Sequence, residues 1–286
     1  MKSIAIVLIT PVADKLTEQQ QTRFSNLLKQ VSYQLVLAKT MPYTFSVTHL
    51  IGSGSEQVLD LANAIEPQAS ANFIYNPIVY NFNTLTNTAT RRRKLLIRDA
   101  VQLLDASSVA FKLLVWLDAD DAPSGYWLTS LTNCYTPLNI LACLRHDVVA
   151  FASLHLTAAY NEFKRLADGA NGVGCGSAIA WRYDLCDEQL MPYLKLTHPL
   201  YNKYDGIEDL ITGIEVARID PNLLSFVAGK YCNPDCSCGF PAIYVYPSYT
   251  LGAPDQRDKR NSLLMQYRKQ AKTSIQGIEQ GYGLIS

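Results

Sequence analysis

Three carboxylates follow a short apolar run near the middle of the chain. Asp118, Asp120 and Asp121 come directly after residues 113–117, a continuous apolar run that predicts a strand buried on both faces. Because side chains alternate along a strand, Asp118 and Asp120 would leave its end on the same side. Like charges this close repel unless a cation lies between them, and oxygen ligands suit Mg²⁺ or Mn²⁺ shared with substrate phosphates. The stretch therefore predicts a metal and phosphate site, with a solvated acidic turn as the alternative.

A second acidic pair lies ninety residues further on. Glu208 and Asp209 directly precede residues 210–218, whose apolar spacing predicts a helix. Two acids at a helix start are stabilised by the helix dipole, so capping explains the pair without any function. The functional interpretation is a general base, or a carboxylate that binds an acceptor, facing the metal site. The residues alone leave both open.

Four cations open the helix that precedes the acidic strand. Arg91, Arg92, Arg93 and Lys94 begin a predicted helix that runs to about Leu104. Cations at a helix start oppose its dipole, so something else must favour them. A phosphate group, a localisation signal and a merely solvated face are all candidates. The position just before the acidic strand favours a phosphate-facing role for at least one arginine.

A glycine-serine turn joins a predicted strand to a predicted helix. Residues 52–55 read Gly-Ser-Gly-Ser and lie between strand 43–51 and helix 56–65. Free amides at a helix start favour negative charge, so this arrangement is a candidate anion or nucleotide cradle. A plain tight turn explains the same residues equally well.

The composition favours a globular protein without a nucleic-acid partner. The chain has 286 residues, 48% of them hydrophobic and 17% charged, and Lys plus Arg equals Asp plus Glu at 25 each. Zero formal net charge gives no electrostatic case for nucleic-acid binding. No apolar run approaches the roughly 18 residues that a membrane span needs. Residues 1–10 are better explained as a buried strand than as a signal peptide. We therefore expect a soluble, cytoplasmic protein with no membrane span.

The cysteines are irregularly spaced. Seven of them are present, an odd number, which argues against a disulfide framework and for a reducing compartment. Cys232, Cys236 and Cys238 could hold Zn²⁺ with a fourth ligand from elsewhere. Their spacing matches no standard zinc knuckle, and no second paired cluster exists in the sequence.

Strand and helix patterns alternate along most of the chain. Residues 169–176 are glycine-rich and predict a loop close to a substrate, since a strand rather than a helix follows them. This alternation predicts a single α/β domain. Its predicted strands are 3–10, 43–51, 72–80, 113–117, 147–156, 177–183 and 242–249, and its predicted helices are 17–39, 56–65, 91–104, 126–144, 210–218 and 255–272.

In this order, these features resemble a glycosyltransferase of the GT-A fold over about residues 3–218. The resemblance is carried by the first strand, the turn at 51–55, the arginine-led helix, residues 117–121 and residues 206–209. The chain looks most similar to inverting, family-two-like enzymes, with some similarity to fungal-type mannosyltransferases. This implies a Rossmann-like mixed sheet flanked by helices in one domain, with a nucleotide-binding half at about 1–125 and an acceptor-binding half at about 126–286.

The resemblance also implies a reaction. A UDP- or GDP-linked sugar donor would bind with Mn²⁺ or Mg²⁺, and the sugar would move to a hydroxyl of a glycan or glycoconjugate acceptor. Asp120 would bind the metal directly, and Asp118, beside Ala119, would reach the ribose or the metal through water. Asp209 would be the catalytic base of an inverting reaction, and Glu208 would help to bind donor or acceptor.

The same resemblance assigns residues to the nucleotide. Those that would border the nucleobase or approach the nucleotide are Thr10, Pro11, Gly52, Ser53 and Ser55, together with one of Arg91, Arg92 and Arg93.

The sequence departs from the family pattern at two places, and two rival functions remain open. The acidic residue usual in the turn after the second strand is replaced by Gly52 and Ser53, and the third acid, Asp121, leaves open which oxygens hold the metal.

A sugar nucleotidyltransferase is one rival, although residues 11–15 lack its glycine-rich signature. The other is a non-catalytic carbohydrate- or nucleotide-binding protein of the same fold.

Overall fold

The computed structural model of the protein describes most of its first half and selected parts of the second. Several features predicted from the sequence lie outside the described residues: Asp120, strand 147–156, the glycine-rich loop 169–176 and the three clustered cysteines. The described residues are 2–32, 43–82, 89–119, 121–123, 141–144, 178–205, 208–219, 224–227, 243–245, 262–263 and 266–267.

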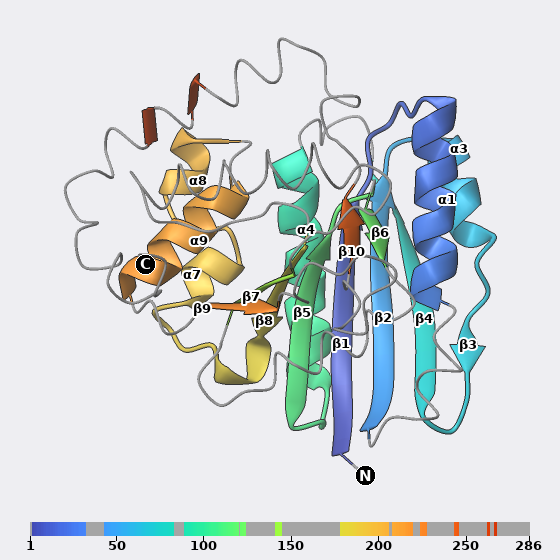
Figure 1. The fold of residues 1–286 in the computed structure, drawn as a ribbon, viewed down its shortest axis with the longest axis horizontal. Helices are drawn as coiled ribbons and strands as arrows, with labels where there is room; N and C mark the ends of the chain where they lie inside the picture. Colours follow the sequence, from blue (N-terminus) through green and yellow to red (C-terminus); the bar gives the residue numbers. More distant parts are fainter. Residues whose placement is uncertain are drawn as a thin grey trace, which may run out of the picture.

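A mixed sheet of eight strands forms the centre of the described fold (Figure 1). Four of its strands, β4, β2, β1 and β5, are mutually parallel, whereas β8 runs antiparallel to both β5 and β7. A short antiparallel pair, β6 (Asp121–Pro123) with β10 (Ile243–Val245), lies apart from it. The spatial order of the main sheet is β3 (Gln68–Ala69), β4 (Phe73–Asn81), β2 (Tyr43–Ser53), β1 (Lys2–Pro11), β5 (Phe111–Leu117), β8 (Ala178–Arg182), β7 (Leu141–Leu144) and β9 (Leu224–Val227).

Helices cover both faces of this sheet. One face packs against α1 (Glu18–Ser32) and α3 (Glu56–Asn63), and the other packs against α4 (Ala89–Ala106). The helices α7 (Met191–Leu194), α8 (Leu200–Lys203) and α9 (Glu208–Ile219) share the core on the α4 side (Figure 1). Side chains of β1 alternate between the two cores, which explains why its sequence is an unbroken apolar run.

Most predicted elements in the described ranges are confirmed. The predicted strands 3–10, 43–51, 72–80, 113–117 and 177–183 correspond to β1, β2, β4, β5 and β8. Helices 56–65, 91–104 and 210–218 correspond to α3, α4 and α9, and α1 occupies part of the predicted helix 17–39. The fold class, an α/β mixed sheet flanked by helices, is as expected.

The predicted helix 126–144 is wrong at its carboxyl end. Residues Leu141–Leu144 form β7, which pairs with β8 on one side and β9 on the other. A short apolar run is compatible with a buried helix and with a buried strand. Here residues 141–144 form a strand because neighbouring strands pair with both of its edges. The strand β9 and the short helices α7 and α8 had no sequence prediction.

The strand order reverses between β1 and β5. The chain moves outward from β1 to β2 and β4, and α4 then returns it to β5 on the other side of β1. The register pairs Pro11 with Gly52 and Ile9 with Trp116, so the carboxyl ends of β1, β2 and β5 share one edge. Ligands of open α/β sheets bind outside such an edge, where the strand order reverses.

Among the described residues, no helix is both long and apolar enough to cross a bilayer.

Candidate functional site

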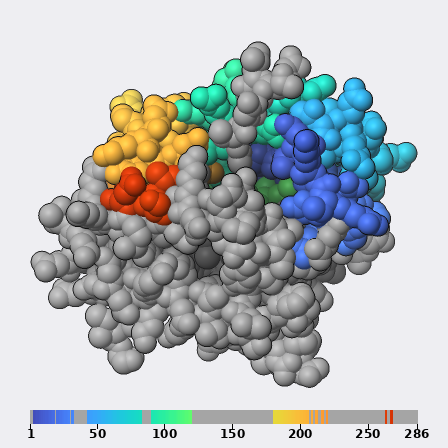
Figure 2. Space-filling view, turned by 90° about the horizontal axis from the view of Figure 1, so that it is seen from above, coloured from blue at the N-terminus to red at the C-terminus, as the bar shows by residue number. Residues whose placement is uncertain are grey.

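Several of the residues predicted to border a nucleotide lie at the carboxyl edge of the sheet. Pro11 ends β1, Gly52 and Ser53 end β2, and Asp118 directly follows β5. Figure 2 looks onto this edge and shows atoms of the first strands and of β5 recessed below the surrounding surface. The structure therefore brings together side chains that are far apart in the sequence.

Arg93 joins the two acidic motifs. Its Nη2 donates to Oδ1 of Asp118, at the end of β5, and its Nη1 donates to Oε1 of Glu208, at the start of α9. Its guanidinium also lies 5.3 Å from the centre of the Trp116 ring. Because Arg93 is only 4% exposed, its charge needs such partners close by. The acidic strand end and the acidic helix start are thus parts of one site.

Glu208 is fixed from several sides. Its Oε2 accepts a hydrogen bond from the Thr90 hydroxyl at 3.2 Å, and its carbonyl accepts one from the Thr212 hydroxyl at 2.6 Å. The Tyr201 hydroxyl lies 2.7 Å from that of Thr212, so α8 supports the first turn of α9. Burial is the main cause that raises the pKa of Tyr201 above its ordinary value, which keeps its hydroxyl protonated. The position of the Glu208 carboxylate is therefore built into the fold.

Arg92, the preceding residue, fastens the loop after β1. Its guanidinium donates to the carbonyl of Val12 and, at 2.6 Å, to Oδ2 of Asp14. Oδ1 of Asp14 accepts the backbone N–H of Gly54 at 2.7 Å. Burial alone would raise the pKa of Asp14, but the hydrogen bonds from Arg92 and Gly54 outweigh it and hold that pKa below its ordinary value. One guanidinium therefore connects the ends of β1 and β2.

A buried polar chain lies beneath the ends of β1 and β2. The Thr10 hydroxyl is 2.8 Å from Nε2 of His49, whose Nδ1 is 2.8 Å from the Tyr75 hydroxyl. All three side chains are fully buried. Burial lowers the pKa of His49 to about 3, so its ring is neutral at physiological pH. The Thr10 hydroxyl is thus bound inside the protein, beneath the edge.

The glycine-serine turn is packed too tightly for larger residues. A Cβ at Gly52 would lie 2.0 Å from Cε2 of Phe82, and one at Gly54 would lie 2.7 Å from the Phe82 carbonyl oxygen. The Ser53 hydroxyl accepts the N–H of Ser55 at 3.2 Å. Ser55 precedes α3, and its side chain makes no capping hydrogen bond. Two N–H groups of the turn are thus already bonded within the protein, to Asp14 and to Ser53, and the Ser55 hydroxyl lies at the start of α3.

One described carboxylate at this edge is accessible from outside the protein. The side chain of Asp118 is 33% exposed, so a bound ion or ribose can reach it. No group of three or more His, Cys, Asp or Glu side chains in the described part of the chain is placed to hold a metal alone. Mg²⁺-type sites use one or two carboxylates together with substrate phosphates, and do not need such a cage.

The predicted site residues differ in how deeply they are buried and in the element that carries them. Arg92 and Arg93 are buried against carboxylates, whereas Arg91 is exposed. Ala119 follows Asp118 at the edge, and Asp209 is the second residue of α9. Sequence reasoning missed Asp14, Thr90, Thr212 and Tyr201. The burial of Arg92 and Arg93 had a signal in the sequence: each lies four residues before an apolar residue, Leu96 or Ile97, that is buried on the same face of the helix.

No protein-family model matches the chain, and no curated protein sequence matches it. Its fold is similar to solved structures of glycosyltransferases. Mouse xyloside xylosyltransferase 1 is 10% identical, with 87% of this chain and 99% of that chain covered and a TM-score of 0.43. A mannosyltransferase from Pyrobaculum calidifontis, solved with GDP-mannose and Mn²⁺, is 11% identical, with coverages of 96% and 68% and a TM-score of 0.48. Glucosyl-3-phosphoglycerate synthase from Mycobacterium tuberculosis, solved with Mn²⁺, UDP and glucosyl-3-phosphoglycerate, is 13% identical, with coverages of 94% and 80% and a TM-score of 0.41.

Proposed function

We propose that the protein is a metal-dependent glycosyltransferase of the GT-A fold. It moves a sugar from a UDP- or GDP-linked donor to a hydroxyl of a glycan or glycoconjugate. The observation that carries this proposal is the pairing of Arg93 with both Asp118 and Glu208. This pairing joins Asp118, one predicted metal ligand, to Glu208, one predicted acceptor-side carboxylate. It supports a single site at the edge where α/β sheets bind nucleotides.

The donor half of the site lies between β1, β2 and β5. Asp120 would hold Mn²⁺ or Mg²⁺ directly, and Asp118 would reach the ribose or the metal through water. The metal would supply positive charge to stabilise the leaving diphosphate. Ser55 and the positive end of the α3 dipole face the anionic donor. Arg92 and Asp14 keep the β1 and β2 ends in register, so the nucleoside meets a preformed surface at Pro11 and Gly52.

The acceptor half begins at α9. Asp209 takes the proton of the attacking hydroxyl onto a carboxylate oxygen, which makes that hydroxyl a stronger nucleophile. We propose that the configuration at the sugar carbon is inverted, because the hydroxyl activated by Asp209 attacks this carbon directly in a single displacement. Glu208 is bound by Arg93 and Thr90 and acts beside Asp209 by fixing the start of α9 against the donor site.

The proposal is tested by donor binding and by donor breakdown. We expect one UDP- or GDP-linked sugar to raise the melting temperature in a thermal-shift screen, and to do so only when Mn²⁺ or Mg²⁺ is present. The same donor should be hydrolysed slowly without an acceptor. A donor that binds but is never hydrolysed or transferred would indicate a non-catalytic binding protein. Release of pyrophosphate from a nucleoside triphosphate and a sugar phosphate would indicate a nucleotidyltransferase.

A further inference from the structure

Tyr267 is one of the last residues that the structure describes, and it is buried against α9. Residues 262–263 and 266–267 are helical, and Leu263 packs against the core on the α4 side. Tyr267 itself is only 2% exposed. Its ring contacts the chain before the acidic pair at the start of α9, and its hydroxyl contacts the chain after this pair.

The hydroxyl of Tyr267 binds the inner face of α9. It donates to Oε1 of Glu215, a residue that is 8% exposed. Glu215 follows Glu208 by seven positions, about two helical turns, so both side chains lie on the same face of the helix. A buried carboxylate needs donors close by, and a hydrogen bond to a charged oxygen is among the stronger kinds. Tyr267 therefore holds α9 about two turns beyond its start.

The ring of Tyr267 contacts the chain before α9. Its centre lies 5.3 Å from that of Tyr204, and the two rings meet edge to face at 70°. Tyr204 directly follows α8, is 3% exposed and precedes Glu208 by four positions. Edge-to-face pairs stabilise beyond the burial of the rings themselves. One side chain thus contacts both segments that flank the acidic pair, and we call Tyr204, Glu215 and Tyr267 the tyrosine clamp.

The inner face of α9 is held at three levels, by partners from three parts of the chain: α4, α8 and the segment that ends at Tyr267. From the start of the helix onward, the pairs are Glu208 with Arg93, Thr212 with Tyr201 and Glu215 with Tyr267. The first pair ties α9 to the donor half of the site. Two contacts that are well separated along one helix fix its direction, which a contact at its end alone does not.

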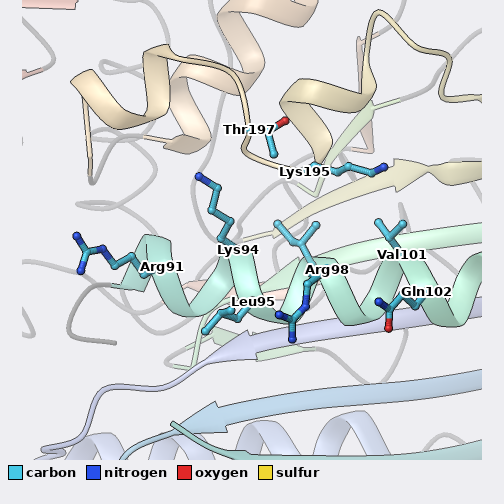
Figure 3. Close-up of a pocket in the computed structure, with 9 residues that line it drawn as sticks. Arg91, Lys94, Leu95, Arg98, Val101, Gln102, Lys195 and Thr197 are labelled. Carbon is cyan, nitrogen blue, oxygen red and sulfur yellow. The ribbon is translucent and has the colours of Figure 1, made fainter. Parts of the chain in front are cut away.

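Packing between α4 and the helices around α9 is incomplete. A cavity of about 550 Å³ separates part of α4 from the segment that follows α7 (Figure 3). Leu95 and Val101 line it from α4, and Lys195 and Thr197 line it from the facing segment. Close packing resists displacement, and along this length the two layers lack it. Directed contacts such as the tyrosine clamp therefore matter more for the orientation of α9.

We propose that Tyr267 is a positioning residue for the acceptor half of the active site. It orients the start of α9, and with it Asp209, against the donor; this role rests on the proposed function. Tyr267 acts through Glu215 and Tyr204 and not on the donor itself, whose half of the site is built on β1, β2 and β5. A tilt of α9 moves the base away from the acceptor hydroxyl, and displacements of this kind are costly to the rate. Loss of the clamp should therefore lower the rate and leave donor affinity unchanged.

Two substitutions of Tyr267 test this role in hydrolysis of the UDP- or GDP-linked sugar that stabilises the parent, with Mn²⁺ present and water as the acceptor. Tyr267→Phe removes the hydrogen bond to Glu215 and keeps the ring on Tyr204. We expect its kcat to fall roughly tenfold, with a donor Kd by calorimetry within about twofold of the parent. Tyr267→Leu removes both contacts and should lower kcat further.

Tyr183→Phe is the matched control. Tyr183 is also buried, and its hydroxyl donates to Oδ1 of Asp105 at 2.5 Å. It directly follows Arg182, which pairs with Leu113 near the start of β5, at the edge of the sheet opposite the proposed site. Both Tyr→Phe variants should lower the melting temperature by about 2–5 °C, because each loses one buried hydrogen bond. Only Tyr267→Phe should lose kcat when both are assayed well below that temperature.

Hydrogen exchange of the amides at residues 212–215 measures the clamp without any donor. We expect exchange roughly tenfold faster in Tyr267→Phe, because this part of α9 opens more readily, and near-parental exchange in Tyr183→Phe. Parental kcat or parental exchange in Tyr267→Phe would overturn the positioning role. Equal losses of kcat in both variants would mean that the rate only follows stability, and would overturn it as well. A parent that hydrolyses no donor would reject the proposed function, whereas the exchange rates would still decide the clamp.

Discussion

The guanidinium of Arg93 donates to the carboxylate of Glu208, 115 positions further along the chain. Both side chains are buried, and the same guanidinium also holds Asp118 at the end of β5. The start of α9 is therefore tied to the carboxyl edge of the sheet through a charged contact. Since a buried charge without a counter-charge is costly, the three residues depend on one another.

Replacing Arg93 with Met should destabilise the protein by about 3–5 kcal/mol, because Glu208 would remain buried without its counter-charge. Urea unfolding measures the loss. The double variant Arg93→Met/Glu208→Gln should recover a large part of it, since the uncompensated charge is then gone. Strictly additive effects of the two single substitutions would show that the contact contributes little.

The substitution Asp209→Asn should leave donor affinity near that of the parent and reduce transfer by a factor of roughly 10² to 10⁴, because the amide cannot take the acceptor proton. Donor affinity comes from calorimetry and transfer from single-turnover kinetics. The neighbouring Glu208→Gln is the comparison: it removes a charge that Arg93 binds, so it should also lower stability. Unchanged turnover in Asp209→Asn would place the base elsewhere.

Acid should destabilise the protein through His49. Its pKa is about 3 in the folded protein against 6.5 in the unfolded chain, so between these values the unfolded state binds more protons. The contribution of His49 is complete above pH 6.5 and falls by about 1.4 kcal/mol per pH unit below it. The difference in unfolding free energy between the parent and His49→Gln should shrink accordingly. A difference that stays constant from pH 7 to pH 4.5 would refute the buried neutral ring, and His198→Gln is the control.

The glycine-serine turn should not tolerate a methyl group at Gly52. An alanine Cβ would overlap the Phe82 ring, which is itself buried, so Gly52→Ala should cost about 1–3 kcal/mol in unfolding free energy and weaken donor binding. Shortening the ring in Gly52→Ala/Phe82→Leu should restore part of the lost stability. A fully stable Gly52→Ala with a parental affinity would mean that Phe82 moves aside freely.

The sequence predicts the strands of the sheet well and the charged contacts at their ends poorly. Runs such as residues 113–117 are buried on both faces, so their apolar character predicts strands directly. The short apolar run at Leu141–Leu144 becomes a strand only because β8 and β9 pair with it, and local patterns do not encode such pairing. The carboxylate partners of Arg92 and Arg93 could not be predicted either, because a phosphate or solvent would satisfy the same cations.

Carboxylates beyond β5 are proposed to hold a metal ion for a nucleotide-sugar donor. Titrating the parent and Asp120→Ala with UDP and GDP in Mn²⁺, by calorimetry, tests it most directly. We predict that the parent binds one of the two nucleotides only with the metal present, and that Asp120→Ala loses this metal-dependent binding. Equal affinities of the two proteins in Mn²⁺ would contradict the claim.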